Sequence, residues 1–156
     1  MQISKMLTGH EFFRSLLPEM VDRISNISSA KKIEKGEAVY GVDKKATHIF
    51  VLLEGQVELR LPGSSGDPGF HVSRVGRGEF FGIAPLMNAD RYTTLAVCTR
   101  TSKVLFIEAK PLMEMLKNHP SVGFQVMTVV ARAYFERYQH LMERIQKALS
   151  DLGREP

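Results

Sequence analysis

Glycines and an arginine gather in the middle of the chain, where their spacing could hold a ligand. Gly76, Gly78 and Gly82 fall within seven residues, so the backbone can turn tightly there or approach another group closely. Residues 83–87 read as one helical turn with an early proline, and Arg91 follows Gly82 by nine residues. Free N–H groups at the start of a helical turn, with a guanidinium nearby, suit an anion. The alternative is a glycine-rich hairpin, a helical turn and an ordinary surface arginine.

The other reactive residue types show no spacing typical of catalysis or metal binding. The five histidines are scattered, and no two of them stand four residues apart as in a helical zinc motif. Cys98 is the single cysteine, which excludes an internal disulfide and a cysteine metal cluster. No serine stands in a G-x-S-x-G turn. We therefore expect a protein that is not an enzyme and that holds no metal and no resident cofactor.

Length and composition are those of one ordinary globular domain, residues 1–156, with 44% hydrophobic and 24% charged residues. A net charge of +4 would favour an anionic ligand but is too small to indicate nucleic-acid binding. The first ten residues lack the apolar core of a signal peptide, and no apolar stretch is long enough to cross a membrane. We expect a cytoplasmic protein without a membrane partner.

Two patterns divide the chain into helical ends and a β-rich middle. Apolar residues at helical spacing cover residues 8–28, where Pro18 predicts a kink or two short helices. Short β-prone runs separated by turns fill residues 30–109, with clean alternation over 56–61. Such a pattern, without βαβ alternation, predicts a mainly β fold: an antiparallel jelly roll or β-roll of about eight strands.

The expected number of strands depends on two turns. Glu54-Gly55 is interpreted as a tight turn between two β-prone runs, and residues 100–102 as a second join. The strands on either side of these turns are 47–53 and 56–61 around the first, and 92–99 and 103–108 around the second.

Helical patterns return over residues 110–150 and end in a long amphipathic helix over 121–150. Its apolar residues step by four and three, which is a heptad period, and Phe135, Met142 and Leu149 widen the stripe. A stripe this broad is most simply buried against a second copy, so we predict a homodimer. The alternative is a single helix lying along its own β-domain. The predicted dimer interface consists of Met127, Ala131, Tyr134, Tyr138, Leu141 and Ile145.

Short motifs stand in a fixed order between residues 12 and 149. They are a Lys-Gly-Glu turn at 35–37, a strand–Glu-Gly–strand hairpin at 49–59, Gly-Glu-Phe-Phe-Gly at 78–82, a β-prone run at 104–107 and a helix ending at His119-Pro120. Their order resembles that of the cyclic nucleotide-binding domain, the sensor module of catabolite-activator-type transcription factors, kinase regulatory subunits and gated channels. The resemblance implies an RmlC-like β-roll with a phosphate-binding cassette at residues 78–94, hereafter the cassette.

In that family an arginine of the cassette binds the cyclic phosphate, assisted by N–H groups at the start of the cassette helix. The resemblance places Arg91 at that arginine's position. One phosphodiester anion would then meet one guanidinium and the positive end of a helical turn. The predicted ligand-binding residues are Gly82, Ile83, Ala84, Arg91, Tyr92 and Thr93.

The cassette departs from the family pattern at three positions. Ile83 stands where the family commonly has a glutamate that accepts a hydrogen bond from the ribose 2′-hydroxyl. Asp90 replaces the proline that often precedes the arginine, and Tyr92 replaces a small residue after it. Losing a charged acceptor costs on the order of 1.5–3 kcal/mol, which corresponds to about ten- to a hundredfold in affinity.

Two functions remain open. The first is a regulatory sensor that binds cAMP, cGMP or a related anionic effector and signals through its C-terminal helix. The second is a dimeric interaction scaffold with a degenerate pocket that binds no nucleotide. Tyr134 and Tyr138 could stack on a base or pack in the interface. Only residues 151–156 follow the long helix, too few for a recognition helix, so we expect protein partners rather than DNA binding.

Overall fold

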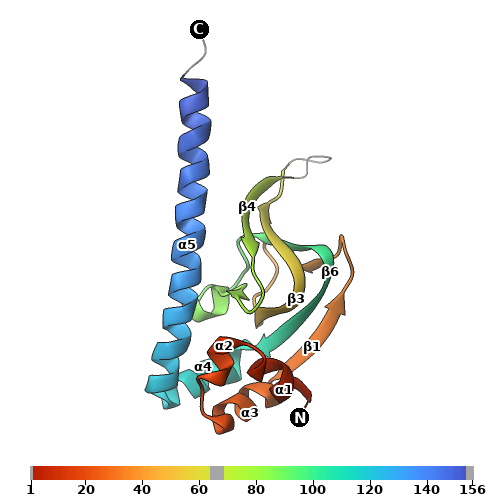
Figure 1. The fold of residues 1–156 in the computed structure, drawn as a ribbon, viewed down its shortest axis with the longest axis vertical. Helices are drawn as coiled ribbons and strands as arrows, with labels where there is room; N and C mark the ends of the chain where they lie inside the picture. Colours follow the sequence, from red (N-terminus) through yellow and green to blue (C-terminus); the bar gives the residue numbers. More distant parts are fainter. Residues whose placement is uncertain (1, 64–68, 154–156) are drawn as a thin grey trace.

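In the computed structural model, helices occupy both ends of the chain and one antiparallel sheet occupies the middle (Figure 1). The structure describes residues 2–63 and 69–153. The helices before the sheet are α1 (Gln2–Thr8), α2 (Glu11–Arg14) and α3 (Pro18–Asn26). The strands are β1 (Ser28–Ile33), β2 (Ala38–Tyr40), β3 (His48–Leu61), β4 (Phe70–Val75), β5 (Phe80–Phe81) and β6 (Leu95–Glu108). A 3₁₀ turn, η1 (Ala84–Met87), follows β5, and α4 (Ala109–Asn118) and α5 (Pro120–Leu152) end the described chain.

The N-terminal helices break where the proline predicted it. Leu17 is extended, and Pro18 occupies the first turn of α3, where its missing N–H does no harm. All of α1 except Thr8 lies before the helical range, residues 8–28, expected from the sequence. Its Leu7 is fully buried in the core shared by the helices and the sheet, so tertiary packing supports a short helix that local spacing does not reveal.

Two long strands replace four of the short ones expected from the sequence. β3 pairs antiparallel with β6 from His48↔Glu108 to Arg60↔Leu95, and the register shifts near Gly55. Both strands bend together there, so the expected turns at Glu54-Gly55 and 100–102 lie inside continuous strands. The described residues form six strands instead of about eight.

The two faces of β3 enter different parts of the core. Ile49, Val51 and Leu53 pack in a cluster with the N-terminal and C-terminal helices. Phe50 and Leu52 point the other way, into a second cluster inside the roll. The alternation of side chains along one strand thus separates the helical packing from the interior that faces the cassette.

α5 has 33 residues, which corresponds to about 50 Å. Its first half lies beside α4, its second half contacts β4 through Arg144, and its C-terminal end extends beyond β4 (Figure 1). Val122, Val126 and Val130 fasten the first half to the core. None of the helices in residues 2–63 and 69–153 is long and apolar enough to span a bilayer.

The bend of β3 gives a first prediction. Gly55 has φ +98°, and a β-carbon there would lie 2.6 Å from Ser102 Cα, whereas Gly36 has φ +90° and open space around it. Gly36→Ala should cost about 1 kcal/mol of the free energy of unfolding, from backbone strain alone. Gly55→Ala should cost about 3 kcal/mol because the clash adds to the strain. Urea denaturation measures both, and equal losses would contradict the bend as the reason for this glycine.

Candidate ligand-binding site

A cavity of about 620 Å³ lies between the cassette and α5, hereafter the α5 cavity. Its volume is within the range of pockets that enclose small organic molecules. Five of the six predicted ligand-binding residues line one wall: Gly82, Ile83, Ala84, Tyr92 and Thr93. The facing wall comes from α5 and includes Met127, Ala131, Tyr134, Arg137, Tyr138 and Leu141.

Gly82 allows the cassette to turn into the cavity. Its φ is +62°, and a β-carbon there would lie 2.6 Å from Cδ2 of Phe50. The chain then forms η1, with Pro85 in its first turn, and leaves it through Asn88 in the left-handed conformation. The glycine-rich stretch is therefore the tight turn that the sequence predicted, and the close neighbour that excludes a side chain is an aromatic ring of β3.

Arg91 does not share the cavity with the other predicted residues. It is exposed, its Nη1 donates to the backbone oxygen of Asp43 at 2.6 Å, and its backbone forms a bridge with Lys45. It lines a separate surface depression beside Glu108 and Lys110. Neighbouring side chains of an extended segment point to opposite sides, so the chain that turns Arg91 outward turns Tyr92 inward. Spacing placed an arginine in the cassette but could not say which way it faces.

Tyr92 occupies the inward position and is only 5% exposed. Its hydroxyl donates to the oxygen of His48 at 2.6 Å and accepts the N–H of His48 at 3.2 Å. Its ring stacks on Tyr40 with centroids 4.1 Å apart. Position 92 therefore contributes a neutral aromatic wall, with its polar atom already bonded to β3.

Arg137 supplies positive charge to the α5 cavity, and reasoning from the sequence missed it. The residue is 7% exposed; its Nη2 donates to Glu79 Oε2 at 3.0 Å and to the oxygen of Phe80 at 2.8 Å. Its Nε and Nη1 are buried without a hydrogen-bond partner, and its Cζ lies 4.7 Å from the centroid of the Tyr134 ring. One signal was available: Arg137 follows Tyr134 by three residues and so shares the face of the helix that carries the inner apolar residues.

The cavity holds one formal charge on its described lining, that of Arg137. Burial raises the pKa of Tyr40 and of Tyr134, so both phenols stay neutral at ordinary pH. Glu79, a partly exposed carboxylate, meets the guanidinium from one side and also accepts the N–H of Gly76. The site is a mostly apolar space with one partly neutralised cation.

The predicted dimer residues divide between two faces of α5. Met127, Tyr134 and Leu141 are partly buried and face their own cavity. Ala131 and Tyr138 line the cavity mouth but are exposed, and Ile145 is exposed beyond it. Large exposed apolar residues of α5 form an outer stripe: Phe124, Phe135, Tyr138, Met142, Ile145, Leu149 and Leu152.

A β-roll, a helical turn between two of its strands and a long helix therefore surround a cavity of small-molecule size. Residues 30–119, more than half of the chain, match the family described as the cyclic nucleotide-binding domain. The chain therefore belongs to the cyclic nucleotide-binding domain family, a regulatory and not a catalytic family.

Two curated relatives share part of the chain. The cAMP-dependent protein kinase regulatory subunit of Mycosarcoma maydis is 30% identical over 98 residues, which is 62% of this chain and 18% of that protein. A protein of Rhodopseudomonas palustris whose name describes a potassium channel is 30% identical over 126 residues, 80% of this chain and 30% of that protein. The chain thus spans 30% or less of the length of either relative.

Solved structures agree with the family. A crystal structure of a protein from Geobacter metallireducens named for cyclic nucleotide binding is 32% identical, with a TM-score of 0.73, covering 86% of this chain and 97% of that one. The catabolite activator protein of Thermus thermophilus has a TM-score of 0.66 at 20% identity, covering 83% of this chain and 61% of that one. The second likeness shows the fold alone.

The buried phenols predict how stability changes at high pH. Burial raises the pKa of Tyr40, Tyr92 and Tyr134 in the native state, whereas in an unfolded chain the pKa of tyrosine is about 10. The stability that these buried neutral phenols contribute is complete below about pH 10. It is lost as the pH rises further, because the unfolded chain then releases phenolic protons that the native state keeps. We expect the free energy of unfolding to fall by about 1.4 kcal/mol per pH unit for each retained proton. Urea denaturation from about pH 9 to about pH 11 measures the slope. Tyr40→Phe should make it shallower, and a flat profile would contradict the burial.

Proposed function

We propose that this domain is a regulatory sensor that binds cAMP, cGMP or a related anionic effector in the α5 cavity and signals through α5. The observation that supports this most is that the cavity has one wall from the cassette and the other from α5. An occupant must touch both, so its binding free energy depends on how the helix lies over the roll. A ligand that favours one helix position shifts the population toward it.

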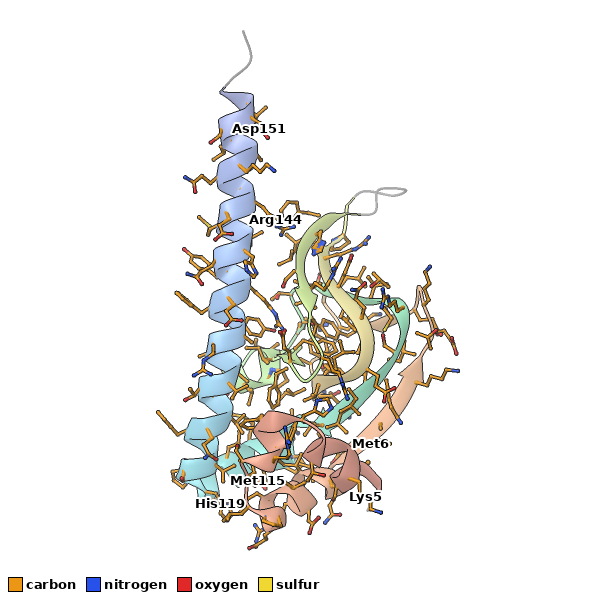
Figure 2. The ribbon with its side chains drawn as sticks, in the orientation of Figure 1. Lys5, Met6, Met115, His119, Arg144 and Asp151 are labelled. Carbon is orange, nitrogen blue, oxygen red and sulfur yellow. The ribbon has the colours of Figure 1, made fainter. Side chains whose placement is uncertain are left out.

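Polar anchors connect α5 to the roll at two levels. Arg137 bonds to Glu79 and to the oxygen of Phe80 in the buried part. Arg144 lies higher, on the side of the helix toward β4 (Figure 2), and donates to the oxygens of His71 and Val72 at 2.7 and 2.6 Å. A ligand that disturbs the lower anchor would therefore change how the upper half of α5 is held.

We further propose that the outer stripe is the output surface and pairs with a second copy of the chain. Phe135 is 60% exposed and Leu149 is 63% exposed, which is unfavourable for a free helix in water. From Phe135 to Leu152 the members of the stripe step alternately by three and four residues, as in the seam of a coiled coil. Because Met127, Tyr134 and Leu141 face the cavity, this interface is narrower than the one expected from the sequence and lies further around the helix.

A dimeric scaffold that binds no nucleotide is the second candidate. It is favoured by Ile83 at the start of η1 and by Tyr92, whose hydroxyl is already bonded to His48. Neither side chain carries a charge that would recognise a ribose or a phosphate. In this case the outer stripe would remain the interaction surface, and the cavity would no longer bind a ligand.

Calorimetric titration with cAMP and cGMP tests the sensor. We expect weak, saturable binding to the unmodified chain. Ile83→Glu should bind about ten- to a hundredfold more tightly, since it adds a charged acceptor for a sugar hydroxyl. Arg91→Ala, which changes a guanidinium outside the cavity, should stay within about twofold of the unmodified chain. No heat at millimolar nucleotide for both the unmodified chain and Ile83→Glu would contradict the sensor and favour the scaffold.

Sedimentation tests the pairing. Ile145→Lys places a charge in the outer stripe and should convert a dimer into a monomer at concentrations where the unmodified chain is paired. Ser150→Lys adds the same charge about 140° away around the helix and should leave the dimer intact. A monomer for the unmodified chain at high concentration would exclude the stripe as a self-interface.

A further inference from the structure

The guanidinium of Arg137 is the polar group in the α5 cavity that the fold leaves only partly paired. A guanidinium carries five N–H donors on three nitrogens. Here Nη2 is bonded to Glu79 and Phe80, while Nε and Nη1 are shielded from water and have no partner in the described protein. A buried donor without an acceptor costs about 1–3 kcal/mol, and more when the group is charged. An acceptor from a bound molecule would remove this cost, because the described protein provides none for these two nitrogens.

The walls around this cation restrict what the acceptor can be attached to. Leu59, Val72, Ile83, Met127 and Leu141 give the cavity an apolar surface, and the ring of Tyr134 lies against the guanidinium. The described lining carries no carboxylate that would accept a sugar hydroxyl. An apolar or aromatic body gains free energy from these walls, whereas a hydroxylated body finds only neutral hydroxyl groups there, such as those of Ser73, Thr93 and Thr94.

We propose that Arg137 of α5, and not an arginine of the cassette, binds the anionic group of the effector, and that the effector is an organic anion with a large apolar body. This inference rests on the proposed function, since it names the charge and chemical class of the molecule bound in the same cavity. Tyr92 occupies the inward cassette position with a neutral phenol, and Arg91 is bonded to the backbone of Asp43 outside the cavity. Arg137 is then the cation on the described lining of the cavity.

Because the cation belongs to α5, binding of an anion at Arg137 acts directly on the position of the helix. Glu79 belongs to the roll and Arg137 to the helix, so their 3.0 Å ion pair ties the two together. An anion in the cavity competes with Glu79 for the same guanidinium. Binding therefore weakens one tie between helix and roll, in addition to any contact that the apolar body makes.

A pair of dyes that differ in one charge tests the proposal on the full chain. 8-Anilinonaphthalene-1-sulfonate carries a sulfonate, and N-phenyl-1-naphthylamine has the same rings without it. We expect the sulfonate dye to bind more tightly to the unmodified chain. Arg137→Met should weaken it about ten- to a hundredfold and leave the uncharged dye within about threefold. Arg91→Met, the matched loss of a guanidinium outside the cavity, should change neither dissociation constant.

A second variant keeps the test valid if Arg137→Met folds poorly by circular dichroism. Glu79→Gln removes the competing carboxylate and should raise the affinity for the sulfonate dye severalfold without affecting the uncharged dye. Ile145→Lys controls for dye bound on the outer stripe and should leave both affinities as they are. Equal losses of both dyes in Arg137→Met, an unchanged sulfonate preference, or weaker sulfonate binding in Glu79→Gln would overturn the proposal.

The same variants separate this inference from the proposed function. Cyclic-nucleotide heat that survives Arg137→Met but disappears in Arg91→Ala would overturn the role of Arg137 and leave the sensor standing. Arg137-dependent sulfonate binding without any cyclic-nucleotide heat would uphold the role of Arg137 and overturn the cyclic nucleotide as effector.

Discussion

The antiparallel ladder between β3 and β6 is the constraint on which the rest of the structure depends. It runs from His48↔Glu108 to Arg60↔Leu95 and bends near Gly55 without ending. One face of β3 packs on the helices and the other faces the interior of the roll. Because the short strand β5 pairs with β3 as well, the start of the cassette is held where the interior of the roll meets α5.

Packing at Phe50 explains why the cassette needs a glycine at position 82. Phe50 lies against Phe81 and Tyr92 as well as against the backbone of Gly82. The aromatic stack fills the inside of the roll up to the cavity wall. The turn that follows has to pass over this stack with a positive φ and no side chain, and the cavity lies between this turn and α5.

Local patterns in the sequence predicted the parts of the fold that local physics decides. The break at Pro18, the β-rich middle and the tight turn at Gly82 all follow from the properties of single residues or short runs. The continuity of β3 through Gly55 did not follow, because a paired partner strand that bends with it decides whether a glycine ends a strand or kinks it. α1 depends on burial of Leu7 against residues distant in sequence, which no local pattern reports.

The cassette wall of the α5 cavity could be predicted from the sequence, but the residue that supplies the positive charge of the cavity could not. Spacing singled out the turn at Gly82 together with Arg91, yet the side on which a side chain leaves an extended segment depends on the register with its neighbour, here the bridge to Lys45. The heptad pattern of α5 likewise combined apolar residues that belong to two different faces of the helix. Apolar residues toward the cavity and those of the outer stripe alternate closely, and only the position of the roll separates them. Arg137 is a charged residue on the face of α5 that lines the cavity, and the apolar pattern around it did not indicate this position.

The two arginine anchors of α5 differ in the free energy that their loss would cost, and this difference gives the proposed signal its direction. Arg137 and Arg144 stand seven residues apart, two helical turns on the same face. The bonds of Arg144 to carbonyl oxygens lie at the surface, where water replaces them at little cost. Arg137 is buried, so leaving it without an anion is far more costly. In the proposed mechanism the helix follows whichever anion satisfies Arg137, and the exposed anchor at Arg144 breaks first. On this proposal, a change at Arg137 in the cavity reaches the upper half of α5, which carries Met142, Ile145 and Leu149 of the outer stripe.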